Sequence, residues 1–301
     1  AGFIGSHLCK YLISLGNHVT CIDNFYTGSK KNLLAIDKNP NFKFIEADIK
    51  KKIDIKVDQI YNLACPASPI HYQKDPVNTI KTNTLGMMNI LENAYKHNST
   101  VLQASTSEVY GDPLISPQEE SYWGNVNPIG VRSCYDEGKR IAETMCTDFS
   151  KQMKINIKIA RIFNTYGSNM QKDDGRVISN FFVQAMQNKD LTVYGDGNQT
   201  RSFCFIEDML DGLVRLMNEK EYNINPVNLG NPEEFKVSDL AKIIIKLTKS
   251  KSKITYQNLP SDDPKIRKPD ISLAKKRLDW YPKIQLLDGL RETENYFRSI
   301  I

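Results

Sequence analysis

The sequence predicts an α/β fold built on a doubly wound parallel sheet. Short, continuous apolar segments alternate along the chain with segments of helical periodicity, which is typical of parallel strands covered by helices on both faces. A glycine-containing turn near the N-terminus leads directly into a helix, as it does after the first strand of such sheets. With 301 residues, of which 40% are hydrophobic and 25% charged, the chain can bury the large core that this fold requires.

The first predicted element is the turn and helix at residues 1–15. Gly2 would let the backbone approach a pyrophosphate, and Gly5 would let the helix pack closely on the sheet. The strand that should precede this turn, and the first glycine of the motif three residues before Gly2, are absent from the sequence. We therefore expect that the first strand is missing and that the sequence record is incomplete.

The next predicted strand, Val19–Asp23, ends in a carboxylate eighteen residues after Gly5. A carboxylate at this position can hydrogen-bond to the adenosine ribose and repel a 2′-phosphate. The pattern therefore predicts NAD, rather than NADP, as the cofactor.

Further elements follow in the same alternation. Strands are predicted at residues 42–45, 60–64, 101–104 and 157–162, and helices at 75–96 and from near Tyr135 to Met153. After residue 166, loops rich in Gly, Asp and Asn alternate with short elements. We predict an NAD-binding domain at residues 1–166, with returns to the sheet near 205–230, and a smaller, interleaved C-terminal domain at 167–301 that mainly binds the substrate.

The C-terminal part should contribute four more helices and one strand. A helix is predicted at residues 207–217 and a strand at 226–229, both as returns to the main sheet. Ser238 is predicted to cap a helix that ends at Lys249, and Asp270 is predicted to cap another. The last helix should span residues 286–297.

The candidate catalytic residues lie at the ends of two of these elements. Tyr135 and Lys139 stand four apart at the start of a helix, so both side chains share one face. A nearby ammonium would stabilise the phenolate, which makes Tyr135 a candidate general base. Many helices carry such a pair without any catalytic role. A catalytic role is supported here by the hydroxyls and the carboxylate of Ser105–Glu108. These follow the strand at 101–104, and strand ends are where such sheets place chemistry.

Charge and cysteine content exclude several classes of protein. The net charge of +5 comes from dispersed Lys and Arg without interleaved aromatic residues, which argues against a nucleic-acid surface. The six Cys form no C-x-x-C pair, so we expect buried free thiols and no metal site. No apolar run reaches the ~18 residues of a membrane span. We expect a cytoplasmic protein by default, and a membrane-anchored Golgi form stays open because the chain starts inside a motif.

The chain resembles the extended short-chain dehydrogenase/reductase family, and within it the UDP-glucuronate decarboxylases (UDP-xylose synthases). The resemblance covers nearly the whole length, and its most specific part runs from Trp123 to Lys139. It implies a Rossmann fold, bound NAD, a UDP-sugar substrate and a homodimer. The matching stretches are Asn62–Pro69, Ala104–Pro113, Tyr122–Gly130, Ser133–Thr144, Arg161–Gly167, Asp174–Phe181, Val193–Phe203 and Arg267–Asp270.

Enzymes of this family begin by oxidising the C4 hydroxyl of the sugar. The related 4,6-dehydratases carry Thr-Asp-Glu where this chain has Thr106-Ser107-Glu108, and Ser107 is a poor acid for expelling a C6 hydroxyl. If C6 is a carboxylate, the C4 ketone makes the sugar a β-keto acid, which loses carbon dioxide without such an acid. The resemblance therefore implies decarboxylation of UDP-glucuronate to UDP-xylose, with NAD regenerated in each turnover. A dehydratase, a 4-epimerase and an inactive truncated homologue stay open as alternatives, as does release of some 4-keto product.

Site residues follow from these motifs. After Tyr166-Gly167 the family usually continues Pro-Arg-Met, whereas this chain has Ser168-Asn169-Met170. The expected catalytic residues are Thr106, Glu108, Tyr135 and Lys139. Cofactor contacts are expected from Gly2, Phe3, Ile4, Gly5, Asp23, Asn24, Phe25, Asp48, Ile49, Leu63, Ala64, Thr82, Tyr135 and Lys139. UDP-glucuronate, with its pyrophosphate and carboxylate, is expected to contact Lys81, Asn164, Arg176, Tyr194, Arg201 and Arg267.

Overall fold

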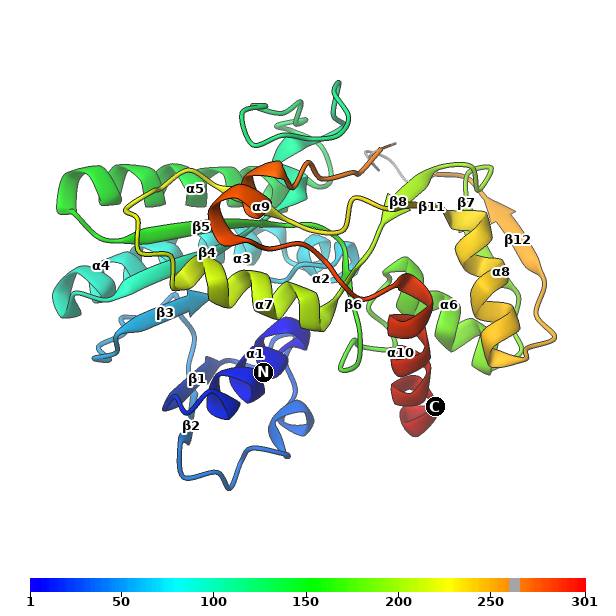
Figure 1. Ribbon diagram of the computed structural model, residues 1–301, viewed down its shortest axis with the longest axis horizontal. Helices are drawn as coiled ribbons and strands as arrows, with labels where there is room; N and C mark the ends of the chain where they lie inside the picture. The colour runs from blue at the N-terminus through cyan, green and yellow to red at the C-terminus, as the bar shows by residue number, and fades with distance from the viewer. Residues whose placement is uncertain (260–265) are drawn as a thin grey trace.

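The computed structural model describes residues 1–259 and 266–301 and has a parallel sheet between two layers of helices (Figure 1). The main sheet has the strand order β10-β5-β4-β3, and all of its pairs are parallel. These strands are β3 (Gln59–Asn62), β4 (Thr100–Thr106), β5 (Ile157–Ile162) and β10 (Val227–Leu229). A separate parallel pair is formed by β1 (Val19–Asp23) and β2 (Phe42–Glu46), in which Val19 lies opposite Phe42. The predicted α/β class and its parallel strands are confirmed.

The two faces of the main sheet have separate apolar cores, because successive residues of a strand point to opposite faces. Val101 packs with α4 (Met87–His97) and α5 (Ser133–Met153), whereas Leu102 packs with α7 (Ile206–Met217) and α9 (Ser272–Leu278). The first helix, α1 (Phe3–Ser14), lies beside α7. Helices therefore cover both faces of the main sheet, as the alternation of strands and helices in the sequence predicted.

The predicted helix at 75–96 is helical over almost that length but is not one regular helix. It consists of α3 (Pro76–Lys81), a π-helical turn at Thr82–Gly86 and α4. The π turn places Asn83 against Gly138 of α5, where a Cβ atom would lie only 2.9 Å from Asn83 Nδ2. The extra residue in this turn therefore coincides with close packing between the two helices.

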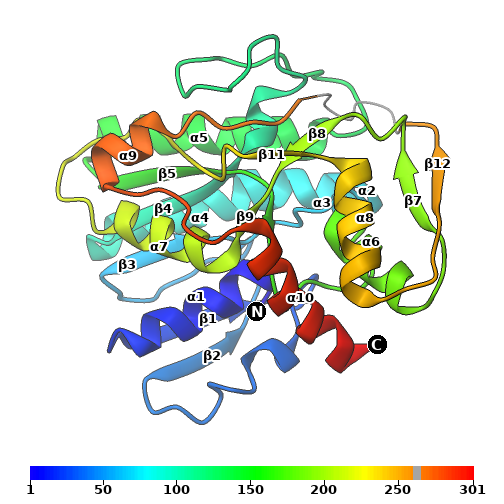
Figure 2. The same cartoon turned by 45° about the vertical axis from the view of Figure 1, so that its right-hand side comes forward.

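The C-terminal lobe has a third core and lies at one end of the sheet (Figure 2). Phe182, Leu240 and Phe297 are fully buried there, on three different helices. The lobe contains α6 (Val177–Met186), β7 (Leu191–Tyr194), β8 (Thr200–Ser202), β11 (Glu234–Lys236), α8 (Val237–Thr248), β12 (Ile254–Gln257) and α10 (Leu286–Ile300). The remaining short elements are η1 (Lys30–Leu33), α2 (Pro69–Lys74), η3 (Ser107–Tyr110), β6 (Thr165–Tyr166) and β9 (Cys204–Phe205).

Two predicted helix caps are wrong. The N-cap of α8 is Lys236, so Ser238 already lies inside the helix. The N-cap of α9 is Ile271, although the Asp270 carboxylate accepts a hydrogen bond from the Ser272 N–H at 2.7 Å. The predicted cap lies two positions after the observed one in α8 and one position before it in α9. Within the described residues, no helix combines the length and apolar character needed to cross a membrane.

Candidate active site

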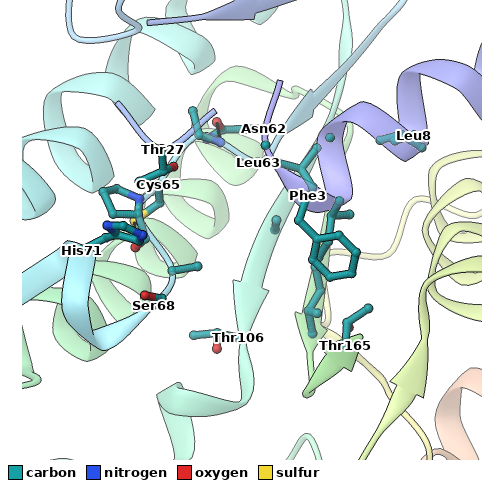
Figure 3. Close-up of a pocket in the computed structure, with 18 of the residues that line it drawn as sticks. Phe3, Leu8, Thr27, Asn62, Leu63, Cys65, Ser68, His71, Thr106 and Thr165 are labelled. Atoms are coloured by element: carbon teal, nitrogen blue, oxygen red, sulfur yellow. Dashed lines mark hydrogen bonds between the residues drawn. The ribbon is translucent and has the colours of Figure 1, made fainter. Parts of the chain in front are cut away.

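A cavity of about 1220 Å³ lies between the main sheet and the C-terminal lobe. The start of α1, the ends of β1 and β4, the loop after β3 and the first turns of α5 line it, and Tyr194 and Arg201 close it from the lobe. Figure 3 shows Phe3 and Leu63 on one side and Cys65, Ser68 and Thr106 around the same space. The cavity thus lies outside the carboxyl ends of the strands, where open α/β sheets bind ligands.

The end of the cavity at α1 fits a dinucleotide. Gly2 is the N-cap of α1, and the first N–H groups of a helix have no partner within it. A Cβ atom on Gly2 or Gly5 would meet none of the described atoms within 4 Å, so both glycines leave open space at this helix end. Asp23 lies in the same lining and accepts a hydrogen bond from Phe25 N at 2.7 Å. The helix end would hold a pyrophosphate, and the carboxylate would hold a ribose.

Most of the expected cofactor residues are brought together in this cavity. Phe25 is the exception, because its ring stacks on Phe44 of β2 with a centroid distance of 5.0 Å and joins the small core between α1 and β1. Asn24 lies beside Asp48 and donates a hydrogen bond to its carboxylate at 3.1 Å. The expected cofactor residues in the lining are Gly2, Phe3, Ile4, Gly5, Asp23, Asn24, Asp48, Ile49, Leu63, Ala64, Thr82, Tyr135 and Lys139.

Tyr135 and Lys139 occupy the first turns of α5, and both are buried. The Lys139 ammonium donates a hydrogen bond to the Ala104 carbonyl at 2.9 Å and lies 5.8 Å from the centroid of the Tyr135 ring. The ring of Tyr72 stacks on that of Tyr135 at 4.9 Å, with an angle of 7° between the planes. The phenol is therefore held between α2 and the end of β4.

The pKa of the Tyr135 phenol is raised in this structure, whereas the Tyr–Lys spacing predicts that it is lowered. Burial raises its pKa well above the usual value, and a hydrogen bond with Thr106 opposes this only in part. The Lys139 ammonium is directed to the Ala104 carbonyl. For Tyr135 to act as a general base, further positive charge beside the ring is needed to lower this pKa.

Glu108 is held by two arginines at the end of β4. Its Oε2 accepts hydrogen bonds from Arg132 Nη2 at 2.5 Å and from Arg267 Nη2 at 2.9 Å, and Arg267 Nη1 donates to the Ser107 carbonyl at 2.6 Å. Burial alone would favour the neutral acid, but Arg267 and Arg132 outweigh it and lower the pKa of Glu108. Glu108 is thus an ionised carboxylate in a buried, arginine-rich corner of the cavity.

The structure brings most of the expected substrate residues to the same cavity. Asn164, Arg176, Tyr194, Arg201 and Arg267 line it. Lys81 does not, because it ends α3 with an exposed side chain. Arg176 pairs at 2.6 Å with the buried Asp174.

Arg132 is a residue of this site that was not predicted from the sequence. It lies three residues before Tyr135, inside the most specific part of the resemblance, and that position beside the catalytic helix was a usable signal.

The substituted loop after Gly167 is tied to α1, since His7 Nε2 lies 2.9 Å from the Ser168 carbonyl and Asn169 Nδ2 donates to Ser6 Oγ at 3.1 Å. In the described part of the chain no three His, Cys, Asp or Glu side chains gather as metal ligands, and all six Cys are free.

Residues 1–230 match the NAD dependent epimerase/dehydratase family. The chain belongs to this family. UDP-glucuronic acid decarboxylase 3 of Arabidopsis thaliana is 54% identical over 99% of this chain and 87% of the plant protein. UDP-glucuronic acid decarboxylase 1 of Danio rerio is 51% identical over 99% of this chain and 71% of its own length.

Among solved structures of this NAD-dependent family, the chain is similar to UDP-glucuronic acid 4-epimerase from Bacillus cereus in complex with UDP-glucuronic acid and NAD. The TM-score is 0.89 and the identity 28%, over 100% of this chain and 97% of the epimerase. The fold around the cavity therefore matches that of a nucleotide-sugar enzyme over the full length of this chain.

Proposed function

We propose that the chain catalyses the NAD-dependent decarboxylation of UDP-glucuronate to UDP-xylose through a 4-keto intermediate. Residues 1–166, with returns near 205–230, would hold NAD, and residues 167–301 would mainly hold the UDP-sugar. The proposal is supported by the dinucleotide features at α1 and β1, by Tyr135 and Lys139, and by the decarboxylase relatives.

The observation that carries the proposal is the pair of guanidiniums at Glu108. Arg132 and Arg267 both contact this carboxylate within the cavity that contains Tyr135. Both guanidiniums are held beside this carboxylate at the cavity, and arginine is suited to planar, bidentate pairing with an anionic group of the substrate. A sugar with a C6 carboxylate supplies that charge, whereas a neutral hexose does not.

The residues around the cavity account for the chemistry in order. Thr106 holds the sugar oxygen next to Tyr135, which takes the proton of the C4 hydroxyl as general base. Gly2, Gly5 and Asp23 would hold NAD, which would supply the hydride acceptor and donor for C4. Oxidation at C4 makes the substrate a β-keto acid, whose ketone accepts the electrons released with carbon dioxide. Glu108 then orients a water or a sugar hydroxyl for protonation at C5. Ser107 is too weak an acid to protonate a leaving hydroxyl.

Incubation with UDP-glucuronate and NAD in deuterated water tests this function, with products identified by mass. We expect loss of carbon dioxide and one solvent deuterium at C5, because the enolate formed by decarboxylation is quenched there. UDP-glucose should give no dehydrated 4-keto-6-deoxy product. A C4 epimer of UDP-glucuronate, separated by chromatography because it has the mass of the substrate, would favour the 4-epimerase alternative. Efficient dehydration of UDP-glucose would favour a dehydratase.

Tyr135→Phe provides the matched inactive control. Removing only the phenol oxygen should leave the fold and NAD binding intact, because the aromatic ring keeps its stacking on Tyr72. Turnover should fall by ~10²–10⁴-fold, which is the typical value of a positioned acid or base. Activity within a few-fold of the parent would show that Tyr135 is not the base.

We further propose that two copies of the chain form a homodimer through the outer face of α3, α4 and α5. α3 and α5 pack against each other, and their surface shows a groove lined by Ile80, Pro128 and Ile141. Apolar side chains that are at least one-third exposed cluster on this face: Val77, Ile80, Leu85, Met88 and Ile141.

A further inference from the structure

The segment that carries Arg267 is clamped at its backbone by Gln118. Gln118 N donates to the Lys268 carbonyl at 2.8 Å, and Asp270 N donates to the Gln118 carbonyl at 2.8 Å. The Gln118 side chain adds a third bond, because its Oε1 accepts from Lys268 N at 2.8 Å. These bonds form an isolated parallel β-bridge between Gln118 and Pro269. Gln118 has no exposed surface, so water does not compete for these groups.

Gln118 is itself fixed by the main sheet. Its Nε2 donates to the Ile115 carbonyl at 2.9 Å. Asn228 of β10 donates from Nδ2 to the carbonyls of both Gln118 and Asp270, at 3.0 and 3.1 Å. The clamp therefore ties a loop, the Arg267 segment and an edge strand of the sheet at one buried point.

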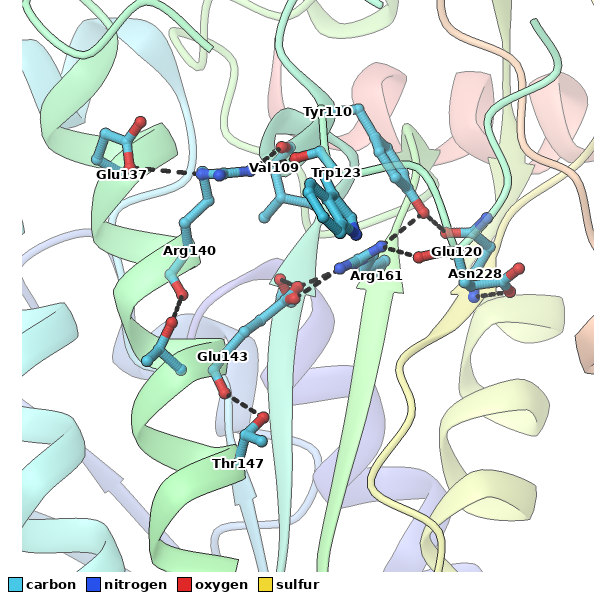
Figure 4. Close-up of polar contacts among 12 residues, drawn as sticks. Val109, Tyr110, Glu120, Trp123, Glu137, Arg140, Glu143, Thr147, Arg161 and Asn228 are labelled. Carbon is cyan, nitrogen blue, oxygen red and sulfur yellow. Dashed lines mark hydrogen bonds and ion pairs between the residues drawn. The ribbon is translucent and has the colours of Figure 1, made fainter. Parts of the chain in front are cut away.

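A chain of polar contacts extends from this point to the helix that carries Tyr135 and Lys139. Figure 4 shows Asn228 next to Tyr110, Tyr110 next to Arg161, and Arg161 against Glu143 of α5. Tyr110 donates to Asn228 Oδ1 at 2.7 Å, and Arg161 donates to the Tyr110 hydroxyl at 3.0 Å and to Glu143 at 2.8 and 3.0 Å. Glu143 lies four residues after Lys139, on the same helix face.

Arg267 lies one residue before Lys268, so the clamp sets where its guanidinium lies. Arg267 is 3% exposed and contacts the Ser107 carbonyl and Glu108, which are 160 and 159 residues away in the sequence. A shift of the Lys268 backbone by ~1 Å would misalign these contacts, and errors of that size at a reacting centre cost ~10²-fold in rate.

We propose that Gln118 is a positioning residue that places Arg267 against Glu108 and the sugar carboxylate. Gln118 touches neither Tyr135 nor Glu108 through its side chain, and it acts through the backbone of residues 268–270. The inference rests on the proposed function in one respect, namely that Arg267 faces the substrate.

Gln118→Met tests the clamp, because methionine fills a similar volume and removes the acceptor for Lys268 N. We expect kcat/KM for UDP-glucuronate to fall by ~10²-fold. Asp208→Leu is the matched control. Asp208 is buried outside the cavity lining and holds another distant backbone segment in the same way, with Oδ2 accepting from Lys283 N at 3.0 Å and from Ile284 N at 2.9 Å. This control should lose stability but keep the parent kcat/KM.

A double-mutant cycle separates positioning from general loss of structure. In an Arg267→Ala background, Gln118→Met should cause no further loss of kcat/KM, because the residue through which Gln118 acts is gone. Losses that add in the double variant would overturn the proposal. If Gln118→Met does not fold, Gln118→Asn replaces it, since the shorter side chain keeps an amide but withdraws its oxygen from Lys268 N.

Hydrogen exchange of the free protein tests the clamp without any substrate. The amides of Lys268 and Asp270 should exchange faster in the Gln118 variant than in the parent and in Asp208→Leu. Unchanged exchange at both amides would overturn the proposal. If the parent chain fails to decarboxylate UDP-glucuronate while these amides respond as expected, the proposed function fails and the clamp stands.

Discussion

Asp136 follows Tyr135 in α5 and is a buried carboxylate that the proposed chemistry does not use. It is 7% exposed, and among the described residues its Oδ1 has no hydrogen-bond partner. Burial, and then the negative charge of Glu108, raise its pKa to about 7 against the opposing effect of Arg132 and Arg267. The arginine-rich corner is therefore strong enough to keep Glu108 ionised but not to hold a second carboxylate in its charged form at acidic pH.

This shift predicts a pH-dependent cost to stability. The unfolded carboxyl ionises near pH ~3.9, so the native state binds the extra proton between that pH and about 7, and stability falls as the pH rises through this window. Asp136→Asn removes the charge at nearly constant shape. Its melting temperature should exceed that of the parent at pH 8, and the difference should shrink towards pH 4. A parent that melts at the same or a higher temperature at pH 8 would contradict this.

Single residues were predicted best where a motif fixes both their type and their place. Tyr135, Lys139, Thr106 and Glu108 all line one cavity, as strand-end and helix-face arguments indicate. The burial of the Tyr135 phenol could not be read from its spacing to Lys139, because it depends on Tyr72, which comes from another helix. The role of Gln118 could not be predicted either, since Lys268, whose backbone it holds, lies 150 residues further along the chain.

At the scale of elements, the strands of the main sheet were predicted closely because their apolar runs are short and uninterrupted. The strand at 157–162 has the predicted bounds, and the strand at 101–104 extends to Thr100–Thr106. The C-terminal lobe was predicted less completely, and α6 was not identified as a helix. The short strands of the lobe, such as β8 and β11, are too short to show a hydrophobic alternation in the sequence. They are set by pairing with distant segments.

The π turn between α3 and α4 leads to a prediction about helix packing. In Gly138→Ala the new methyl group would lie 2.9 Å from Asn83 Nδ2, so Asn83 would have to leave Cys65 Sγ and the Thr79 carbonyl, its partners at 3.1 and 3.0 Å. Overpacking of this kind costs about 1–3 kcal/mol, which offsets or exceeds the roughly 1 kcal/mol that alanine gains over glycine in a helix. We expect a lower melting temperature for Gly138→Ala.

A second substitution checks the cause. Adding Asn83→Ala should make the Gly138→Ala change neutral or stabilising, because the group that it would strike has been removed. If Gly138→Ala is equally harmful with and without Asn83, the π turn does not depend on this contact. Thermal unfolding of the four proteins in this cycle gives the coupling directly.

At the scale of the whole molecule, the proposed homodimer would use the outer face of α3 to α5. Tyr135 and Lys139 are buried on the inner side of α5, so pairing through the outer side would leave the cavity open to substrate. A stable interface buries about 800 Å² on each partner and has an apolar centre. The cluster around Ile80 and Ile141 supplies such a centre on two adjacent helices.

A charge in that centre should therefore separate the copies. Ile80→Lys and Ile141→Lys would each place an ammonium in the desolvated middle of the interface, and because the interface would repeat the residue on both copies, two like charges would face each other. We expect the mass from light scattering to fall from that of a dimer to that of a single chain, with NAD binding retained. Leu287→Lys on α10 is the matched control, since Leu287 is 43% exposed against 42% for Ile141 but lies away from this face. A parent chain that is already a monomer would contradict the dimer. Variants that stay dimeric would place the interface elsewhere.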